Sequence, residues 1–445
     1  MNLELETTGF ADGKKRVNRQ WLAFVDDPGV ENEVINLYPD VGYQIFEGFG
    51  GAFTDSAGYV FSLMNDEAKQ RLLAAYFGPG GAGYTLGRIS LDSCDFSLEP
   101  YEAMSDPNDK FLSSFSLSRA GQYVFPLIQA AEKTLGQSLS LIAAPWSPPA
   151  FMKTTGQRNH GGKLRSEHRA FWADYLARYV TELRRQGFNL RRLTIQNEPK
   201  AAQSWDSCVY TAEEEKVFIR DFLVPALRKN NLHDLELFLW DHNKERVYER
   251  ARDILDRDLL SLVTGVAFHW YSGDHFEALD LIREKFPGKK LIQTEACVEY
   301  SKADRNNLFK WAEKYAQDII GDLNAGMTAF YDWNILLDER GGPNHVGNFC
   351  DAPFLYHTDT GTLEERISYS YITHFSRYIR PGAQRIGFSR YSSDIGVTAF
   401  QNTDGTIAAV FLNQTGAAQW VNLRIEGRLT GFSLPPSSIT TGVLA

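Results

Sequence analysis

Residues 166–199 read SEHRAFWADYLARYVTELRRQGFNLRRLTIQNEP, and this stretch carries the pattern that decides the fold. Its first part predicts an amphipathic helix that Ser166 caps and Gly187 ends. The apolar stripe of that helix consists of Trp172, Leu176, Tyr179 and Leu183. A short apolar run with β-branched residues follows at Arg192–Asn197 and predicts a strand. Helices that alternate with such strands are typical of an α/β protein with a parallel sheet.

The same alternation extends from about residue 43 to residue 334. Eight short apolar runs, separated by longer amphipathic segments, predict eight βα units. The expected strands are Tyr43–Phe49, Tyr84–Leu91, Leu139–Trp146, Arg192–Asn197, Leu235–Asp241, Val263–Trp270, Lys290–Glu295 and Met327–Trp333. Eight units of this kind indicate a (β/α)8 barrel, also called a TIM barrel.

Beyond about residue 380 the pattern changes to short alternating runs, which predict antiparallel strands. The runs are Gln384–Phe388, Gly396–Gln401, Ile407–Asn413 and Gln419–Glu426. The stretches Arg16–Asp26 and Glu33–Tyr38 have similar β character. We therefore expect an accessory antiparallel β-sandwich built from both chain termini, and a division into residues 1–42, 43–378 and 379–445.

Composition excludes several classes of protein. The 46 basic and 56 acidic side chains give a formal net charge of −10, the wrong sign for an extended phosphate-binding surface, so nucleic acid is not an expected partner. No apolar run approaches the roughly 18 residues of a membrane-spanning helix. The start, Met1–Gly13, lacks the basic-then-apolar order of a secretory signal, and the chain as given is expected to be cytoplasmic.

In a barrel of this type, the residues at the carboxyl ends of the strands converge on one face. Two carboxylates occupy such positions: Glu198 follows the fourth expected strand and Glu295 closes the seventh. A single glutamate there would more often cap a helix or pair with arginine. Two of them, surrounded by tryptophans, suit a retaining glycosidase, in which carboxyl groups about 5 Å apart bracket one bond.

Other residues near the strand ends support a sugar as the ligand. The C–H faces of a pyranose ring pack against aromatic rings, and Trp146, Trp270 and Trp333 are available for such contacts. Hydroxyl groups need polar partners, which Asp95, Asn197 and Asn348 provide.

Alternative chemistries have weaker support. Gly78–Gly83 matches GxGxxG, but it follows a helical stretch and precedes a strand, the reverse of the dinucleotide-binding order, so we interpret it as a loop. A metal held by Asp241, His242 and His269 is a minor alternative. Cys94 and Cys297 are interpreted as inert buried thiols.

Longer motifs occur in a fixed order along the chain. They are Gly48–Asp55 (GFGGAFTD), Ser93–Ser97 (SCDFS), Ala144–Pro149 (APWSPP), Asn197–Pro199 (NEP), Phe268–Tyr271 (FHWY), Thr294–Cys297 (TEAC) and Gly341–Asn344 (GGPN). With these motifs the chain strongly resembles glycoside hydrolase family 30, on its glucosylceramidase-like (acid β-glucosidase) side. The resemblance extends over essentially the whole chain.

The resemblance implies a retaining, exo-acting β-glucosidase without a metal or organic cofactor. It assigns Glu198 as the general acid/base and Glu295 as the nucleophile. The residues that would bind the sugar or lie beside the nucleophile are Asp95, Trp146, Asn197, His269, Tyr271, Trp333 and Asn348. We expect Arg88 and Tyr271 to stabilise the charge of Glu295, and apolar or like-charged surroundings to raise the pKa of Glu198.

Several alternatives remain open at this point. Within the same mechanism, the substrate could be a β-fucoside or a β-xyloside, because one hydroxymethyl group changes specificity by modest energies. A carbohydrate-binding protein without turnover and a barrel metalloenzyme are further alternatives. The stretches Lys200–Asp206 and His345–Gly347 do not resemble the animal lysosomal enzymes, so the aglycone is open between a ceramide, a simple alkyl or aryl group and a short oligosaccharide.

Overall fold

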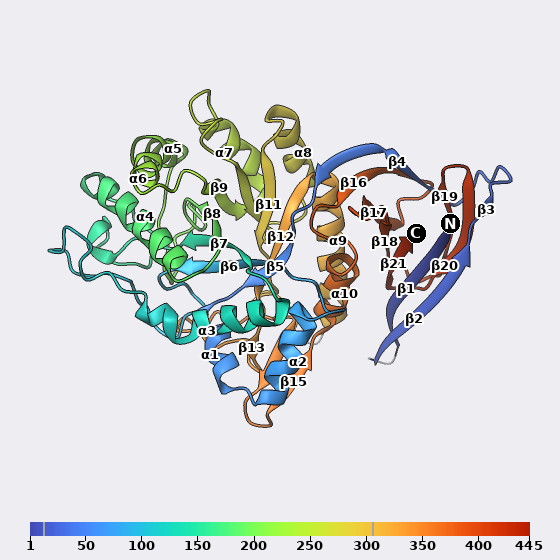
Figure 1. Ribbon diagram of the computed structural model, residues 1–445, viewed down its shortest axis with the longest axis horizontal. Coiled ribbons are helices and arrows are strands. Elements are labelled where there is room, and N and C mark those ends of the chain that lie inside the picture. The colour runs from blue at the N-terminus through green and yellow to red at the C-terminus, as the bar shows by residue number, and fades with distance from the viewer. Residues whose placement is uncertain (12–13, 305–306) are drawn as a thin grey trace.

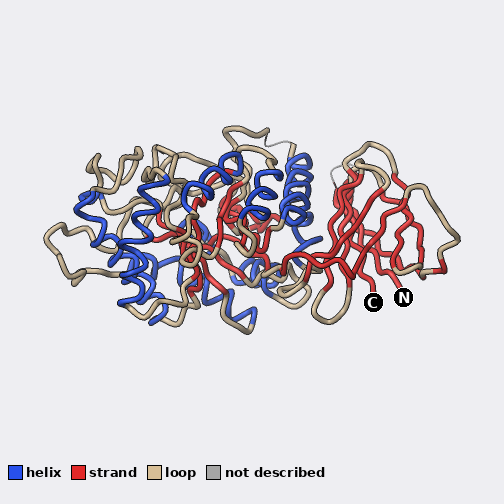
Figure 2. The backbone as a smooth tube through the Cα atoms, turned by 90° about the horizontal axis from the view of Figure 1, so that it is seen from above, coloured by secondary structure: helices blue, strands red, loops and turns tan. Residues whose placement is uncertain are grey.

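The computed structural model describes residues 1–11, 14–304 and 307–445, and the chain forms a helix-covered barrel beside a unit built from strands (Figure 1). Viewed from above, the helices gather around the barrel, while the strand unit carries the positions labelled N and C (Figure 2). Within the described residues no helix combines the length and apolar character needed to cross a membrane.

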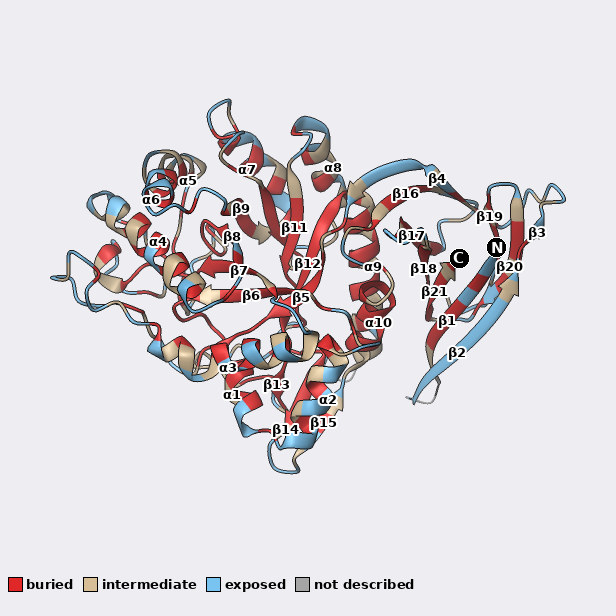
Figure 3. Ribbon diagram, viewed as in Figure 1, coloured by how far each residue is buried: buried red, intermediate tan, exposed pale blue. Residues whose placement is uncertain are grey.

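Eight parallel strands close into a barrel in the order β10-β11-β12-β5-β6-β7-β8-β9. Their bounds are β5 Gly48–Ala52, β6 Leu86–Leu91, β7 Ser140–Pro145, β8 Leu190–Thr194, β9 Glu236–Asn243, β10 Gly265–His269, β11 Lys290–Glu295 and β12 Met327–Asn334. These strands are mostly buried on both faces (Figure 3), because helices cover them outside and side chains such as Ile142, Phe238 and Tyr331 fill the interior. The predicted barrel is confirmed.

Helices connect successive strands and cover the barrel. The α-helices are α1 Asp55–Leu63, α2 Asp66–Phe77, α3 Ser118–Leu135, α4 Arg169–Arg185, α5 Ala212–Phe218, α6 Val224–Lys229, α7 Val247–Ile254, α8 Phe276–Lys285, α9 Leu308–Ala325 and α10 Ile367–Ser376. Short helical turns are η1 Ala150–Met152, η2 Ser166–His168, η3 Ile219–Leu223 and η4 Lys244–Arg246.

Helix α4 has the predicted apolar stripe, since Trp172, Leu176, Tyr179 and Leu183 are all buried. Its start differs from the prediction. Ser166 lies in the 3-10 turn η2, and α4 begins at Arg169 without a side-chain cap.

The first expected strand, Tyr43–Phe49, is wrong in its position. Tyr43 belongs to β4 (Val34–Ile45), which pairs with the strand at Gln384–Arg390, and the first barrel strand is β5. The chain changes sheets at Phe46–Glu47, and Gly48 follows with φ +137°, a backbone conformation that side chains other than glycine rarely adopt. The division at residues 42/43 and 378/379 stays a prediction, although β4 continues to Ile45.

A second glycine brings β5 close to its neighbour. A Cβ on Gly50 would lie 2.2 Å from the carbonyl oxygen of Leu86, so only glycine fits where β5 meets β6. The Gly-rich GFGGA sequence of β5 thus helps the barrel to close.

The second domain is a ten-stranded, mostly antiparallel sheet assembled from both ends of the sequence, as predicted. Its strands are β1 Asn2–Ala11, β2 Lys14–Ala23, β3 Val25–Asp26, β4 Val34–Ile45, β16 Gln384–Arg390, β17 Ile395–Gln401, β18 Ile407–Asn413, β19 Gln419–Ile425, β20 Arg428–Leu434 and β21 Ser438–Leu444. Strands β1 and β21 pair directly, and residues such as Leu3, Phe411 and Leu444 share one apolar core.

A small third sheet, not predicted from the sequence, follows β12 along the chain and lies beside α1 and α2 (Figure 1). It consists of β13 Leu337–Asp338, β14 Phe354–His357 and β15 Thr362–Glu365. The loop that joins β13 to β14 contains Asn348, a predicted site residue.

Candidate active site

A cavity of about 110 Å³ contains both strand-end glutamates. Of the residues predicted from the sequence, those that line it are Asp95, Trp146, Asn197, Glu198, Tyr271, Glu295, Trp333 and Asn348. They follow or end the strands β6, β7, β8, β10, β11 and β12, except Asn348, which comes from the long segment after β12. The cavity therefore lies at the carboxyl ends of the barrel strands, where enzymes of this architecture carry out their chemistry.

Glu295, the last residue of β11, is held by two donors. The Nη1 atom of Arg88 donates to Oε2 at 2.6 Å, and the hydroxyl of Tyr271 donates to Oε1 at 2.8 Å. Arg88 is fully buried. Both carboxylate oxygens thus accept a hydrogen bond, one of them from a cation, and this fixes the orientation of the carboxylate.

Glu198 follows β8 in a strained backbone conformation, with φ +46°. Its amide donates to the carbonyl oxygen of Asp241 at 2.9 Å, which holds this conformation in place. Its Oε1 atom lies 3.4 Å from Nδ1 of His269 and 3.6 Å from Nδ1 of His242. Glu198 is therefore surrounded by imidazole rings, whereas Glu295 is paired with a guanidinium.

Asp241 lies between the two glutamates and links them through one buried network. Its Oδ1 atom is 3.1 Å from Nε2 of His269, and its Oδ2 atom accepts from Nη2 of Arg88 at 3.0 Å. Arg88 also donates to the side-chain oxygen of Asn197 at 2.9 Å. Polar contacts thus run without interruption from Glu198 through His269, Asp241 and Arg88 to Glu295.

This network determines the charges of Glu198 and His269. Burial raises the pKa of Glu198, but the hydrogen bond from His269 and the charges of His242 and His269 outweigh it and lower the pKa to about 2. Burial lowers the pKa of His269, but the charge of Glu295 and the contacts with Asp241 and Glu198 raise it to about 9. The expectation of a raised pKa at Glu198 is therefore wrong, because the two imidazoles counteract the effect of burial.

The inner wall of the cavity is aromatic. Trp146 and Trp333 stack with ring centroids 5.5 Å apart, and the guanidinium of Arg88 lies 4.9 Å and 5.2 Å from the two ring centroids. Both indoles are buried. A cation of this kind, packed against the two rings, fixes the aromatic wall and the Glu295 carboxylate in one arrangement.

Asp95 and Asn348 form a polar edge beside this wall. The side-chain amide of Asn348 donates to Oδ2 of Asp95 at 3.1 Å, and Asn344 holds the Asn348 backbone through hydrogen bonds of 3.0 Å and 2.6 Å. Burial and the nearby charge of Glu295 raise the pKa of Asp95 to about 8, against the hydrogen bond from Asn348. Asp95 is thus able to donate as well as accept hydrogen bonds near neutral pH.

Two expected residues lie elsewhere. His269 is fully buried behind Glu198 and does not line the cavity, so it contacts the carboxylates instead. Trp270 points away: its indole donates to the carbonyl oxygen of Cys297 at 3.0 Å and its ring packs 4.4 Å from that of Tyr315 on α9. The use of Trp270 as a sugar-packing wall of this cavity is therefore wrong.

The sequence interpretation missed four cavity residues: Asn243, which ends β9, Glu299 and Lys302, which follow β11, and Cys350, which follows β13. Gln203 and Trp205 lie in the stretch Lys200–Asp206, which was expected on the aglycone side, and His242 was expected only as a metal ligand. The rule that βα loops build such sites could have indicated the missed residues.

Burial raises the pKa of the Cys94 and Cys297 thiols well above the ordinary value, which makes them poor nucleophiles. Glu198, His242 and His269 place one ligand atom each within 4.8 Å of one another. Asp241, the carboxylate expected in that set, does not belong to it: it contacts the other ring nitrogen of His269, Arg88 and the hydroxyls of Thr194 and Thr294.

Comparisons with known proteins show the family of the chain. Residues 46–379 match the glycosyl hydrolase family 30 TIM-barrel domain, and residues 382–442 match the family 30 beta sandwich domain. Putative glucosylceramidase 3 of Caenorhabditis elegans is 34% identical over 92% of this chain and 82% of its own length. The lysosomal acid glucosylceramidase of Mus musculus is 31% identical over 86% of this chain and 77% of its own.

Two further proteins extend the comparison. An endo-1,6-beta-D-glucanase of Neurospora crassa is 26% identical over 96% of this chain and 89% of its own length. The crystal structure of SrfJ from Salmonella typhimurium superimposes with a TM-score of 0.94 at 36% identity, covering 100% of this chain and 99% of the other. The chain therefore belongs to glycosyl hydrolase family 30 and is a glycoside hydrolase.

Proposed function

We propose that this protein is a retaining, exo-acting β-glucosidase in which Glu295 is the nucleophile and Glu198 the general acid/base. The observation that carries the proposal is the unequal environment of two carboxylates in one cavity. Glu295 accepts from Arg88 and Tyr271, whereas Glu198 faces His242 and His269. Two carboxylates whose surroundings differ in this way take different roles.

In the first step, an oxygen of Glu295 forms a bond to the anomeric carbon while the bond from that carbon to the leaving oxygen breaks. The leaving oxygen takes a proton from Glu198. In the second step, water attacks the anomeric carbon, Glu198 accepts a proton from this water, and the carboxylate of Glu295 is released.

The proton for the first step comes from the coupled pair of Glu198 and His269. With pKa values of about 2 and about 9, the free pair carries one proton on His269 across the neutral range. The charge of Glu295 is the largest contribution that raises the pKa of His269. When Glu295 bonds to the sugar this charge disappears, His269 holds its proton less strongly, and the proton moves to Glu198 and the leaving oxygen.

Trp146 and Trp333 pack against the apolar face of the sugar, while Asp95, Asn197 and Asn348 bind its hydroxyl groups. Exo action is supported by the buried inner wall, where the exposed fractions of Trp146 and Trp333 are 1% and 2%. A β-glucoside is supported by the relatives named as glucosylceramidases. A β-xyloside lacks the hydroxymethyl group of a β-glucoside, and a β-D-fucoside lacks the 6-hydroxyl and has the opposite configuration at C4. Both are alternatives within the same mechanism. The resemblance to an endo-1,6-beta-D-glucanase makes internal cleavage of a β-glucan a second candidate.

The test uses p-nitrophenyl β-D-glucoside, β-D-fucoside, β-D-xyloside and β-D-galactoside with the wild type and with Glu295→Gln. We expect the wild type to prefer the glucoside, with release of the β-anomer first as seen by proton NMR, and Glu295→Gln to be inactive. Azide should partly restore the activity of Glu295→Ala and yield a glycosyl azide. Release of the α-anomer, or full activity of Glu295→Gln, would exclude the proposed mechanism.

A further inference from the structure

The segment that follows Glu198, residues Pro199–Ser207, forms part of the outer cavity wall; we call it the Trp205 loop. Two of its side chains, Gln203 and Trp205, line the cavity. The side-chain amide nitrogen Nε2 of Gln203 lies 3.5 Å from Oε2 of Glu198. Trp205 also packs against the apolar cluster that contains Trp146 and Trp333, so it continues the aromatic inner wall outward.

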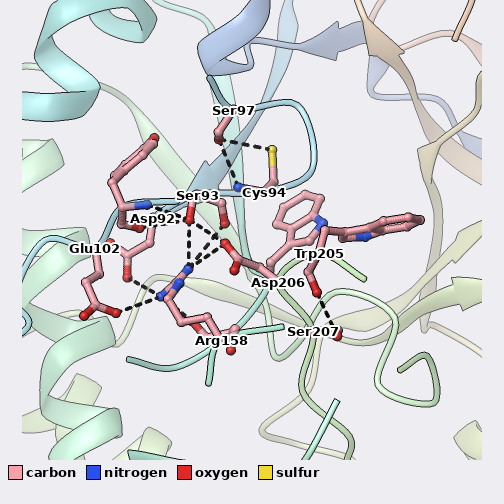
Figure 4. A network of polar contacts seen from close by, with 12 residues as sticks. Asp92, Ser93, Cys94, Ser97, Glu102, Arg158, Trp205, Asp206 and Ser207 are labelled. Carbon is pink, nitrogen blue, oxygen red and sulfur yellow. Dashed lines mark hydrogen bonds and ion pairs between the residues drawn. The ribbon is translucent and has the colours of Figure 1, made fainter. Parts of the chain in front are cut away.

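A buried ion network anchors this loop (Figure 4). Arg158 donates to Asp206, the residue after Trp205, at 3.1 Å, and it also lies 3.4 Å from a carboxylate oxygen of Glu102 and 3.6 Å from one of Asp92. The exposed fraction of Asp206 is 2%. Burying several charges gains little stability in itself, so its main effect here is to fix the position of Asp206 and of the residue before it.

Hydrogen bonds to Ser207 complete the anchoring. Its hydroxyl accepts from the backbone amides of Gly161 at 3.0 Å and of Gln203 at 3.1 Å. Lys153 donates to the backbone carbonyls of Ser207 and Arg158. The turn from Gln203 to Ser207 is thus fixed at both of its ends, and Trp205 is presented by a preorganised loop.

The leaving group of a glycoside must depart on the side of the acid, because Glu198 protonates its oxygen. The Trp205 loop contacts Glu198 through the side chain of Gln203, and His242 contacts it from β9. Four other residues of the lining are hydrogen-bonding or charged: His242, Asn243, Glu299 and Lys302. An alkyl chain placed here would remove these groups from water without replacing their hydrogen bonds, at a cost. A sugar ring would pack its C–H face on the indole and give its hydroxyl groups to the polar residues.

We infer that the outer half of the cavity is a subsite for a hydroxylated leaving group, a second sugar unit that stacks on Trp205. This inference rests on the proposed function and specifies its substrate class: a β-linked disaccharide or oligosaccharide, not a ceramide. A lipid chain would instead need the adjoining cavity of about 420 Å³, which includes Trp270, Val298 and Trp311 and shares Tyr271, Glu299 and Lys302 with the first cavity.

The sugar subsite at Trp205 and the lipid alternative in the adjoining cavity can be distinguished with Trp205→Ala and its matched control Trp311→Ala. Three substrates are compared: β-glucosyl fluoride, which has no aglycone to stack, a β-1,6- or β-1,4-linked glucose disaccharide, and octyl β-glucoside. For Trp205→Ala we expect the ratio of kcat/KM on the disaccharide to kcat/KM on the fluoride to fall about 10- to 100-fold, the range for lost apolar contacts in a pocket. Trp205→Phe should recover most of this loss, and Trp311→Ala should keep the wild-type ratio.

The outcomes are distinguishable. Two results would overturn the leaving-group subsite and favour a lipid aglycone: an unchanged ratio in Trp205→Ala, or a wild type that prefers octyl glucoside and loses this preference in Trp311→Ala. Neither result would contradict the proposed glucosidase activity. A wild type that does not hydrolyse the fluoride would overturn the proposed function itself, and the subsite with it.

Discussion

Arg88→Lys is the substitution that most directly tests the buried network of the site. Arg88 forms three hydrogen bonds, to Glu295 at 2.6 Å, Asn197 at 2.9 Å and Asp241 at 3.0 Å. Two of these acceptors are carboxylates. A lysine preserves the positive charge, but its single ammonium group on a flexible stem cannot reproduce the planar fork that reaches all three at once.

The expected loss follows from these contacts. Lysine can satisfy one carboxylate, so one hydrogen bond to a charged group and one to the neutral Asn197 are lost. Bonds to charged groups contribute about 1.5–3 kcal/mol and neutral ones about 1 kcal/mol, which gives a loss of about 3 kcal/mol. Since about 1.4 kcal/mol corresponds to a factor of ten in rate, we expect kcat/KM to fall roughly 100-fold if the network acts on the transition state.

The assay is kcat/KM on p-nitrophenyl β-D-glucoside, corrected for the folded fraction by circular dichroism. The matched control is Arg192→Lys, a substitution of another buried barrel arginine, which pairs with Glu236 and Tyr331 at the opposite end of the barrel. The control should lower the unfolding temperature but keep the wild-type kcat/KM. Full activity of Arg88→Lys, or an equal loss of activity in the control, would refute the role given to the network.

Three further predictions concern the acid/base and metals. Glu198→Ala should slow glucosides with poor leaving groups, such as methyl glucoside, far more than dinitrophenyl glucoside, because only the former need protonation; equal slowing would show that Glu198 is not the acid. The pair of Glu198 and His269 loses its proton as the pH rises through about 9, so kcat/KM should fall there. His269→Asn removes the charge that lowers the pKa of Glu198, so the fall in kcat/KM with rising pH should begin at a lower pH. A fall that stays near pH 9 would contradict the sharing of one proton between Glu198 and His269. EDTA should leave the activity unchanged, whereas added Zn²⁺ should inhibit by bridging Glu198, His242 and His269; loss of activity with EDTA would favour a metalloenzyme.

The strand-end glutamates were predictable because the barrel repeat is regular. A residue that closes an apolar run in a barrel lies on one known face, so Glu198 and Glu295 could be placed together without coordinates. Trp270 was misplaced although strand alternation contains the answer: it follows His269, whose side chain points inward, and successive side chains point to opposite faces.

The charge of Glu198 could not be predicted in this way. It depends on His269, which comes from β10, and on the Glu295 charge that keeps His269 protonated. These distances arise only when three strands close into the barrel. Strand β1 was missed for a related reason: its sequence NLELETTGFA is largely polar, and it is stabilised by pairing with β21 at the other end of the sequence.

The pairing of β1 with β21 has a consequence for synthesis on the ribosome. Thr7 and Thr440 hydrogen-bond to each other although 433 residues separate them, so the sheet cannot be completed until almost all of the chain has been made. The barrel is translated in between, while β1 and β2 can pair with each other but the second edge of β1 still lacks its partner β21. Unpaired strand edges promote aggregation. Strand β2, the edge strand of the finished sheet, carries Lys14, Lys15 and Arg16. The same charges that protect the edge of the folded enzyme thus also protect the nascent chain.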